Sequence, residues 1–291
     1  MVNPGLLLIR GLGHSGSTVL DLVLGAHPNV VGVGEAVRVL NANQTKVSTT
    51  NRLTNPDNLI ATHPCTCGEL AQKCPVWGEF MRPSYIGMDS TLEEKMEKLI
   101  SRVVCSHQSV RWIVESYQSD EELLKFKASK YPVKVIHLAR DVRSWVHSEA
   151  RRGVSRYGRG FSVGWRGLIR WWRINKKIES ILRDSSLQTF NLGYEEFALA
   201  PAKALSLLCD WLELDFDPRM LLPGSCSKSH VIAGNRMRYQ PGRRNEILYD
   251  GAWLGSSAIS VRSSTLFPPI NSLNRKLVYS NNILGSMWPQ I

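Results

Sequence analysis

The residues with the clearest chemical potential form a glycine-rich loop near the N-terminus, Gly11-Leu12-Gly13-His14-Ser15-Gly16-Ser17-Thr18. The loop follows an apolar run expected to be a strand and precedes an amphipathic run expected to be a helix. Backbone N–H groups at such a turn, with the positive end of the helix dipole, form a cradle for an anion. The spacing is that of a nucleotide triphosphatase phosphate loop, but Ser17 replaces the lysine that contacts the β and γ phosphates. The loop therefore predicts a phosphate site not built for ATP or GTP hydrolysis; a tight turn packing helix on strand is the alternative.

A second candidate anion site follows a later apolar run, residues 133–138. It consists of Arg140-Asp141-Val142-Arg143, with Ser148 eight residues beyond Arg140 on the helix expected next. Guanidinium and hydroxyl groups at the carboxyl edge of a strand suit a phosphate monoester, which accepts two hydrogen bonds from one arginine. Two such sites on one sheet predict a ligand with two separated phosphates. A surface network of arginine and aspartate is the alternative for this stretch alone.

Three of the six cysteines, Cys65, Cys67 and Cys74, lie within ten positions of one another, next to His63. Three thiolates and an imidazole are ligands that zinc accepts, but the C-x-C spacing is tighter than the usual C-x-x-C and no second pair follows. A zinc site, a disulfide and reduced structural cysteines all stay open, and we assign no metal ligand. Six cysteines in 291 residues are too few for a disulfide scaffold.

Short β-rich runs alternate with helical patterns along the chain, which is typical of a parallel sheet covered by helices. Helical periodicity appears over residues 20–24 and 164–183, and the tryptophans of the second stretch are expected in the core. We expect an α/β fold in a single domain over residues 1–291, with a P-loop-type parallel sheet of about five strands. Residues 41–80 are expected to form a loop or lid insertion, and the Pro- and Asn-containing residues 256–291 an irregular C-terminal segment. The expected strands are residues 6–10, 30–33, 110–114, 133–138 and 188–192.

Composition limits the class of protein without choosing a ligand. Hydrophobic residues make up 43% and charged residues 21%, which excludes a predominantly disordered chain. Thirty-six Lys and Arg against 25 Asp and Glu give a net charge of +11, which attracts nucleic acid, acidic lipid or a phosphorylated small molecule alike. No apolar run approaches the roughly 20 residues of a membrane span, and the first apolar run is too short for a signal peptide. We therefore expect a cytoplasmic protein with no membrane span.

Taken in order, three motifs resemble the cofactor-binding regions of sulfotransferases that use 3′-phosphoadenosine 5′-phosphosulfate (PAPS). Residues 11–18 resemble the 5′-phosphosulfate loop, and residues 140–148 resemble the 3′-phosphate motif R-D-x-R-x-x-x-x-S. Between them, residues 24–35 resemble the L-x-x-H-P-x-V-x-x-x-x-E stretch of carbohydrate and protein-tyrosine sulfotransferases. The resemblance extends over roughly residues 5–255 and is strongest at these motifs. It implies the sulfotransferase fold, PAPS as co-substrate and no required metal.

The resemblance also implies the catalytic residues for sulfuryl transfer to an acceptor hydroxyl by in-line displacement. Glu35 falls on the general base of these enzymes. Pairing with Arg38 is the structural alternative for Glu35, and the two roles are compatible. His14 stands where relatives carry arginine, so it is the second catalytic candidate, and Arg10 is the other residue that could supply the missing cation.

The resemblance also implies which residues bind the sulfuryl donor. Arg238 lies in a late stretch, residues 230–238, that is similar to the loop closing over the nucleotide, and Glu115 and Ser116 are given a supporting role at the cleft. The expected cofactor-binding residues are Gly13, His14, Ser15, Gly16, Ser17, Thr18, Arg140, Ser148 and Arg238.

The sequence also bears on the acceptor and leaves two alternative functions open. The acceptor hydroxyl belongs to a small molecule, a lipid or a carbohydrate, and a basic cluster after the 3′-phosphate motif suggests that it is acidic. A small-molecule kinase with a degenerate phosphate loop is the alternative. A nucleic-acid-binding protein is less favoured, because the sequence has no zinc-finger spacing or helix-turn-helix signature, so no nucleic acid partner is expected. The basic cluster consists of Arg151, Arg152, Arg156, Arg159 and Arg166.

Overall fold

A five-stranded parallel sheet with flanking helices confirms the predicted α/β class. The computed structural model describes residues 4–42, 62–82, 90–118, 126, 130–157, 162–235, 238, 240 and 246–284, with backbone alone at residues 42, 152–157 and 162–163. The strand order is β2-β3-β1-β4-β5, and each strand coincides closely with a predicted one. The strands are β1 (Gly5–Arg10), β2 (Val30–Gly32), β3 (Trp112–Glu115), β4 (Val133–Ala139) and β5 (Gln188–Gly193).

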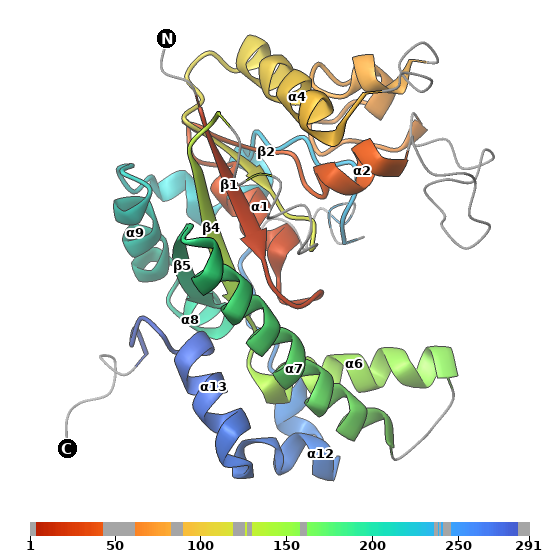
Figure 1. Cartoon of the computed structure of the whole chain (residues 1–291), viewed down its shortest axis with the longest axis vertical. Coiled ribbons are helices and arrows are strands. Elements are labelled where there is room, and N and C mark those ends of the chain that lie inside the picture. The colour runs from red at the N-terminus through yellow and green to blue at the C-terminus, as the bar shows by residue number, and fades with distance from the viewer. Residues whose placement is uncertain are drawn as a thin grey trace. The chain divides into compact units, whose positions relative to one another are not determined.

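The chain divides into two compact units, whose elements are labelled in Figure 1. The first unit comprises Met1–Ile9, Thr18–Val135 and Asp217–Glu246; the second comprises Arg10–Ser17, Ile136–Phe216 and Ile247–Ile291. The division falls inside the glycine-rich loop region, so that the loop belongs to the second unit and nearly all of the helix after it to the first. A single domain over residues 1–291 stays a prediction.

In the first unit, β3 lies between β1 and β2, with Ile113 opposite both Leu6 and Val31. These strands are buried along their whole length, as expected for parallel strands with both faces covered. A capping box of Thr91 and Glu94 begins helix α4, which packs against α2 (Figure 1). The helices of this unit are α1 (Ser17–Leu24), α2 (Ala36–Ala42), α4 (Leu92–Ser106) and α10 (Pro223–Cys226), with 3-10 turns η2 (Ala71–Lys73), η3 (Gly78–Met81) and η4 (Pro218–Leu221).

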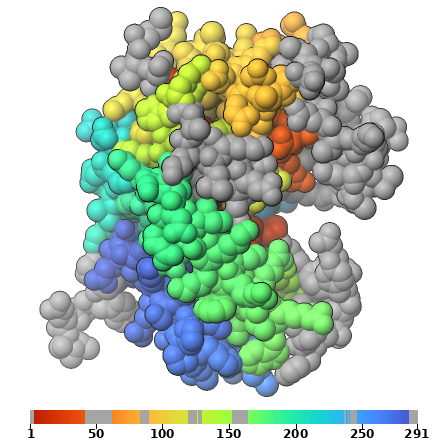
Figure 2. Space-filling view, in the orientation of Figure 1, coloured from red at the N-terminus to blue at the C-terminus, as the bar shows by residue number. Residues whose placement is uncertain are grey.

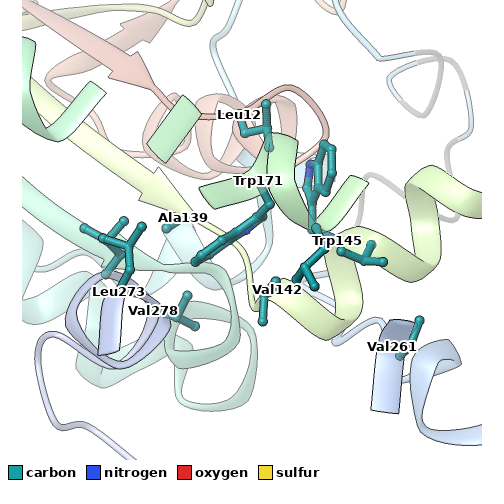
Figure 3. Close-up of a cluster of buried hydrophobic side chains, with 11 residues drawn as sticks. Leu12, Ala139, Val142, Trp145, Trp171, Val261, Leu273 and Val278 are labelled. Carbon is teal, nitrogen blue, oxygen red and sulfur yellow. The ribbon is translucent and has the colours of Figure 1, made fainter. Parts of the chain in front are cut away.

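A cluster of buried apolar side chains forms the core of the second unit around Trp145 and Trp171 (Figure 3). Trp171 is fully buried, which confirms its predicted place in the core. Leu12 joins the same cluster and so anchors the glycine-rich loop on the unit's core. The helices are α6 (Val142–Tyr157), α7 (Ser162–Ser185), α8 (Tyr194–Leu199), α9 (Pro201–Trp211), α12 (Ile259–Arg262) and α13 (Pro268–Val278), with 3-10 turns η6 (Ala252–Gly255) and η7 (Ser264–Leu266).

The C-terminal segment is more regular than predicted. Residues 256–291 were expected to be irregular, but α12 and α13 lie within them and pack against α7, whose green surface meets their blue surface in Figure 2. The prolines that suggested irregularity, Pro268 and Pro269, occupy the first positions of α13, where a missing N–H breaks no helical hydrogen bond. Leu273 and Leu277 then enter the core at helical spacing.

The predicted insertion at residues 41–80 is described only in part. Residues 43–61 lie outside the described residues, as do residues 285–291 at the C-terminus. Residues 62–82 contain η2 and η3, and both Trp77, just before η3, and Phe80, within η3, are completely buried. Within the described ranges, every helix is too short or too polar to span a lipid bilayer.

Candidate active site

The glycine-rich loop adopts a backbone conformation that depends on glycine. His14 and Gly16 have φ angles of 73° and 99°, in the left-handed region, and the Ser15 hydroxyl donates to the Leu12 carbonyl at 2.6 Å. A Cβ atom at Gly16 would lie 2.6 Å from the ring of Tyr194, so no larger residue fits there. The resulting compact turn ends at the first residues of α1, the geometry in which backbone N–H groups hold an anion.

Arg140 lies against this loop within the second unit. Its Nη1 donates to the His14 carbonyl at 3.3 Å, and its guanidinium lies 5.3 Å from the ring centroid of Tyr194. Nε donates to the Ser144 hydroxyl at 2.8 Å, which fixes the plane of the group. The structure thus brings together two sequence-predicted elements, the phosphate loop and the arginine that follows β4.

The remaining nitrogen of Arg140 contacts a residue that the sequence did not indicate. Nη2 donates to Oδ2 of Asp250 at 2.6 Å. Burial opposes ionisation of Asp250, but the hydrogen bonds from Arg140 and the Ala252 N–H, together with the nearby positive charge, outweigh burial and lower the pKa of the carboxyl. The Asp250 carboxylate therefore occupies a position next to Arg140 that an anionic ligand would otherwise occupy. It follows no strand and belongs to no motif, so no local signal pointed to it.

Arg143, the second arginine of the motif, serves the fold. Its guanidinium holds the Asp141 carboxylate in two hydrogen bonds of 2.9 and 2.8 Å and stacks 4.4 Å from the ring centroid of Trp253. Although burial acts to raise it, the pKa of Asp141 is lowered by this contact, and Tyr279 donates a further hydrogen bond at 2.9 Å. Arg143 thus forms a partly buried ion pair with Asp141, and a contact of Arg143 with a phosphate stays a prediction. Ser148 lies half-buried on α6.

Glu35 lies in the first unit, at the turn between β2 and α2. Its Oε2 accepts a hydrogen bond of 2.8 Å from Arg38, so the expected pairing is present, and 23% of its side chain is exposed. Gly34 before it has a φ angle of 66°, and a Cβ atom there would lie 2.6 Å from Val231 and 2.8 Å from the Ala233 carbonyl oxygen. The backbone in front of Glu35 is therefore fixed by close packing.

Two buried acidic side chains hold this turn from the protein interior. Asp21 accepts a hydrogen bond of 3.0 Å from the Gly34 N–H, and Glu115 accepts one of 3.4 Å from the Val37 N–H; Ser116 N–H donates to the Gly34 carbonyl at 2.9 Å. Glu115 and Ser116 were expected in a supporting role, whereas Asp21 was missed. The sequence cue that could have identified Asp21 is a single acidic residue among the leucines and valines of an apolar helix. Burial raises the pKa of Asp21 to about 7.

The segment at residues 231–235 connects further predicted residues in the first unit. Arg238 is buried and donates from Nη1 to the carbonyls of Gly234 and Asn235, and from Nη2 to that of Ile232 at 3.0 Å. The Asn235 N–H in turn donates to the Thr18 hydroxyl at 3.2 Å. Because the Glu35 N–H also donates to this segment, the structure gathers Thr18, Glu35 and Arg238 around one stretch of chain.

The cysteine stretch meets a histidine that is distant in sequence. Sγ of Cys65, Cys67 and Cys74 and a ring nitrogen of His230 all lie within 4.8 Å of one another, and His63 is not part of this group. The structure joins none of the six cysteines in a disulfide. The hydrogen bond between Cys65 and Cys67 raises the pKa of the first thiol and lowers that of the second, as expected when Cys65 donates and Cys67 accepts.

The predicted site residues divide between the two units. Loop residues 11–17, Arg140 and Ser148 belong to the second unit, whereas Thr18, Glu35 and Arg238 belong to the first. Of the two candidate loop cations, Arg10 is buried and His14 is exposed.

Comparison with known proteins agrees with this architecture. A family model described as "Sulfotransferase family" matches residues 6–218, and the chain belongs to the sulfotransferase family. Its fold is similar to the sulfotransferase domain of an olefin synthase from Synechococcus PCC 7002, with a TM-score of 0.61 and 19% identity over 96% of this chain and 94% of that one. It is equally similar to the sulfotransferase domain of the curacin biosynthetic pathway, with a TM-score of 0.60 and 20% identity over 96% and 97% of the two chains. A search of curated proteins gave no significant match. The resemblance found in the sequence motifs is confirmed at the level of family and fold.

Proposed function

We propose that this protein is a PAPS-dependent sulfotransferase that transfers a sulfuryl group to an acceptor hydroxyl. The observation that carries the proposal is Arg140, buried and hydrogen-bonded to the backbone of a phosphate loop that lacks the lysine of ATP- and GTP-hydrolysing enzymes. The loop can bind one phosphate while Arg140 beside it binds another, which suits a nucleotide that carries two separated phosphates. Membership of the sulfotransferase family supports this donor.

The residues present fit the donor. A Cβ atom at Gly13 would meet no atom within 4 Å, so the loop leaves open space beside its backbone, whereas Gly16 is closed by Tyr194. Loop residues 13–18 would hold the 5′-phosphosulfate, with Arg140 and Ser148 toward the 3′-phosphate and Arg238 toward the nucleotide. When bound, PAPS supplies an activated sulfuryl group. Backbone N–H and hydroxyl donors stabilise the charge that develops on it, so we propose that the transfer step itself uses no metal.

Glu35 is proposed as the general base. Arg38 hydrogen-bonds Oε2, which leaves Oε1 to take the proton from the acceptor hydroxyl. The acceptor oxygen forms its bond to sulfur as the bond between sulfur and the phosphate oxygen breaks, and 3′-phosphoadenosine 5′-phosphate (PAP) leaves with that electron pair. His14 or Arg10 would supply the additional positive charge at the loop.

The acceptor is proposed to be the hydroxyl of a small molecule, a lipid or a carbohydrate, and to be acidic. Arg151 on α6 and Arg166 on α7 are exposed and belong to the basic cluster that suggests an acidic acceptor. The side chains of Arg152, Arg156 and Arg159 lie outside the described residues. A cytoplasmic location stays a prediction.

The test measures transfer of labelled sulfate from PAPS to a library of hydroxyl acceptors, beside calorimetric binding of PAP. We expect Glu35→Gln to lower kcat by about 100-fold or more while PAP affinity is retained, because a general base contributes roughly 10²- to 10⁴-fold. Glu93→Gln, at an exposed position on α4, is the matched control and should keep wild-type activity. Full activity of Glu35→Gln would exclude Glu35 as the base. Magnesium-dependent ATP binding without PAP binding would instead favour the kinase alternative.

A further inference from the structure

We call the group formed by Cys65, Cys67, Cys74 and His230 the Cys3His cluster, and the transfer step proposed above does not use it. Cys65 and Cys67 lie on a tight turn closed by the Cys65 N–H, which donates to the Glu69 carbonyl at 2.8 Å, and by Gly68 with a φ angle of 97°. Cys74 follows the 3-10 turn η2. His230 comes from a segment more than 150 residues later in the chain, so the fold rather than local sequence assembles the four side chains.

The spacing of the ligand atoms matches a tetrahedral metal site. His230 Nδ1 lies 3.2 Å from Cys74 Sγ and 4.0 Å from Cys65 Sγ, and all four ligand atoms lie within 4.8 Å of one another. Ligands at about 2.3 Å for sulfur and about 2.0 Å for nitrogen around one zinc ion are separated by about 3.5 to 3.8 Å. A zinc ion therefore needs only small adjustments of these side chains.

The surroundings of His230 are those of a metal-binding histidine. Its Nδ1 faces the sulfur atoms, while its Nε2 lies 2.8 Å from Nε2 of His107. Metal-bound histidines use the second ring nitrogen in such a hydrogen bond, which fixes the ring and the tautomer. The indole of Trp77 donates to the His230 carbonyl at 2.6 Å, and His230 N–H donates to the Gly32 carbonyl, so the backbone of the ligand is held as well.

A second contact clamps the two chain segments together next to the cluster. Thr66, between the two cysteines of the tight turn, donates from its hydroxyl to the Ser229 carbonyl and accepts a hydrogen bond of 2.9 Å from the Val231 N–H. Besides the contacts among the cluster's own side chains, the hydrogen bonds of Thr66 hold the two chain segments together. This is preorganisation of the kind that a metal site requires.

We propose that Cys65, Cys67, Cys74 and His230 bind one structural zinc ion. Four protein ligands complete a tetrahedral zinc coordination shell and leave no position for water or substrate, which distinguishes a structural from a catalytic site. Three sulfur atoms and one imidazole also form a donor set that binds zinc in preference to magnesium or calcium, which favour oxygen ligands. The ion would connect residues 62–82 to residues 231–235, the segment that contacts Glu35 and Arg238. The proposal does not depend on PAPS being the donor.

The first test uses the full-length wild-type protein. Zinc content is measured by mass spectrometry after purification under reducing conditions, and the zinc is then exchanged for cobalt. We expect one zinc per chain, and after exchange the visible bands of tetrahedral cobalt with thiolate-to-cobalt charge transfer in the near ultraviolet. A protein that holds no stoichiometric zinc, and that shows no such bands with added cobalt, would overturn the proposal in favour of reduced structural cysteines.

Variants assign the ligands. Cys67→Ser is chosen because Cys67 is the exposed member of the cluster and the substitution is least damaging to packing, and Cys105→Ser removes another exposed cysteine as the matched control. We expect Cys67→Ser to lose stoichiometric zinc and the cobalt bands, and Cys105→Ser to keep both. Retention of the cobalt spectrum by Cys67→Ser, or its equal loss in Cys105→Ser, would contradict the assignment. Should Cys67→Ser fail to fold, the wild-type cobalt spectrum still decides between a thiolate-rich site and none.

Discussion

The Nε2 atoms of His107 and His230 lie 2.8 Å apart, although the two residues come from the end of α4 and from a segment more than 120 positions later. For His230 to bind a metal through Nδ1, its ring proton must lie on Nε2, so that His230 donates and His107 accepts. His107 therefore acts on the proposed zinc ion through its ligand, as a positioning residue.

Replacing His107 should weaken zinc binding without abolishing it. We expect His107→Ala to lower zinc affinity by about 10- to 100-fold, the usual effect of losing such a partner, as measured by competition with a chromophoric chelator. His107→Gln keeps an acceptor oxygen and should recover part of the loss. Equal affinity of wild type and His107→Ala would show that this contact does not orient the ligand, and equal weakening in both variants would indicate a role in packing instead.

Arg140 gives a prediction about donor binding, because its Nη2 is engaged by Asp250. An anionic ligand must compete with that carboxylate, which is 48% exposed and so is displaced at modest cost. We expect Asp250→Asn to tighten PAP binding roughly threefold to tenfold and Arg140→Lys to weaken it, both measured by calorimetry.

The control for Asp250 must change the net charge equally. Asp184→Asn, at the exposed end of α7 in the same unit, does so away from Arg140. Equal tightening in Asp184→Asn would assign the effect to net charge alone. Weaker PAP binding in Asp250→Asn would show that Asp250 orients Arg140 rather than competing for it.

Gly34 links the packing of the first unit to Glu35, the proposed general base. Gly34→Ala places a Cβ against Val231 and the Ala233 carbonyl in a left-handed conformation, so we expect the free energy of unfolding to fall by about 1 to 3 kcal/mol. The displaced turn should lower kcat more than it alters donor affinity. Gly255→Ala, where a Cβ meets no atom within 4 Å, is the control and should show no loss. Urea unfolding of both variants checks the stability, and a neutral Gly34→Ala would contradict the packing argument.

The sequence predicted what depends on local pattern. The five strands are short β-rich runs between helical stretches, and the phosphate loop is marked by glycines at fixed spacing, two of which the structure uses for close packing or a left-handed turn. The same reasoning identified Glu35 only through its resemblance to a known motif, because an isolated glutamate after a strand has no pattern of its own.

Predictions that depended on distant parts of the chain were less complete. His230 lies 165 positions from Cys65, so spacing could not reveal it as the fourth member of the cluster, and the nearby His63 is not part of that group. Arg143 was expected to face a phosphate, but Asp141 two residues earlier holds it, which only the folded backbone decides. In α13 the prolines suggested a break because the sequence does not show that they stand at its first turn.

Asp21 makes the stability of the protein depend on pH. Burial raises its pKa from the ordinary 3.8 to about 7, so the folded protein favours the protonated acid. The unfolded chain releases this proton near pH 4, and the folded chain retains it until about pH 7. The contribution of Asp21 to the free energy of unfolding is therefore fully present below pH 4 and is lost as the pH rises toward 7, by an amount on the order of 4 kcal/mol.

Asp21→Asn removes this titration while an amide oxygen can still accept the Gly34 N–H. We expect the variant to gain stability relative to wild type between pH 5.5 and pH 8, measured by urea unfolding at both values. Part of the decrease in the free energy of unfolding with rising pH should persist in the variant. Burial also raises the pKa of Glu195 to about 8, and that residue destabilises the fold in the same direction as the pH rises. Asp217→Asn is the matched control: Arg219 lowers the pKa of Asp217 to about 2, so that carboxyl stays ionised throughout this window and its loss should leave the slope unchanged. An Asp21→Asn protein with the wild-type slope would show that Asp21 is ionised in the folded state, and that the turn before Glu35 is held by a carboxylate rather than by a neutral acid.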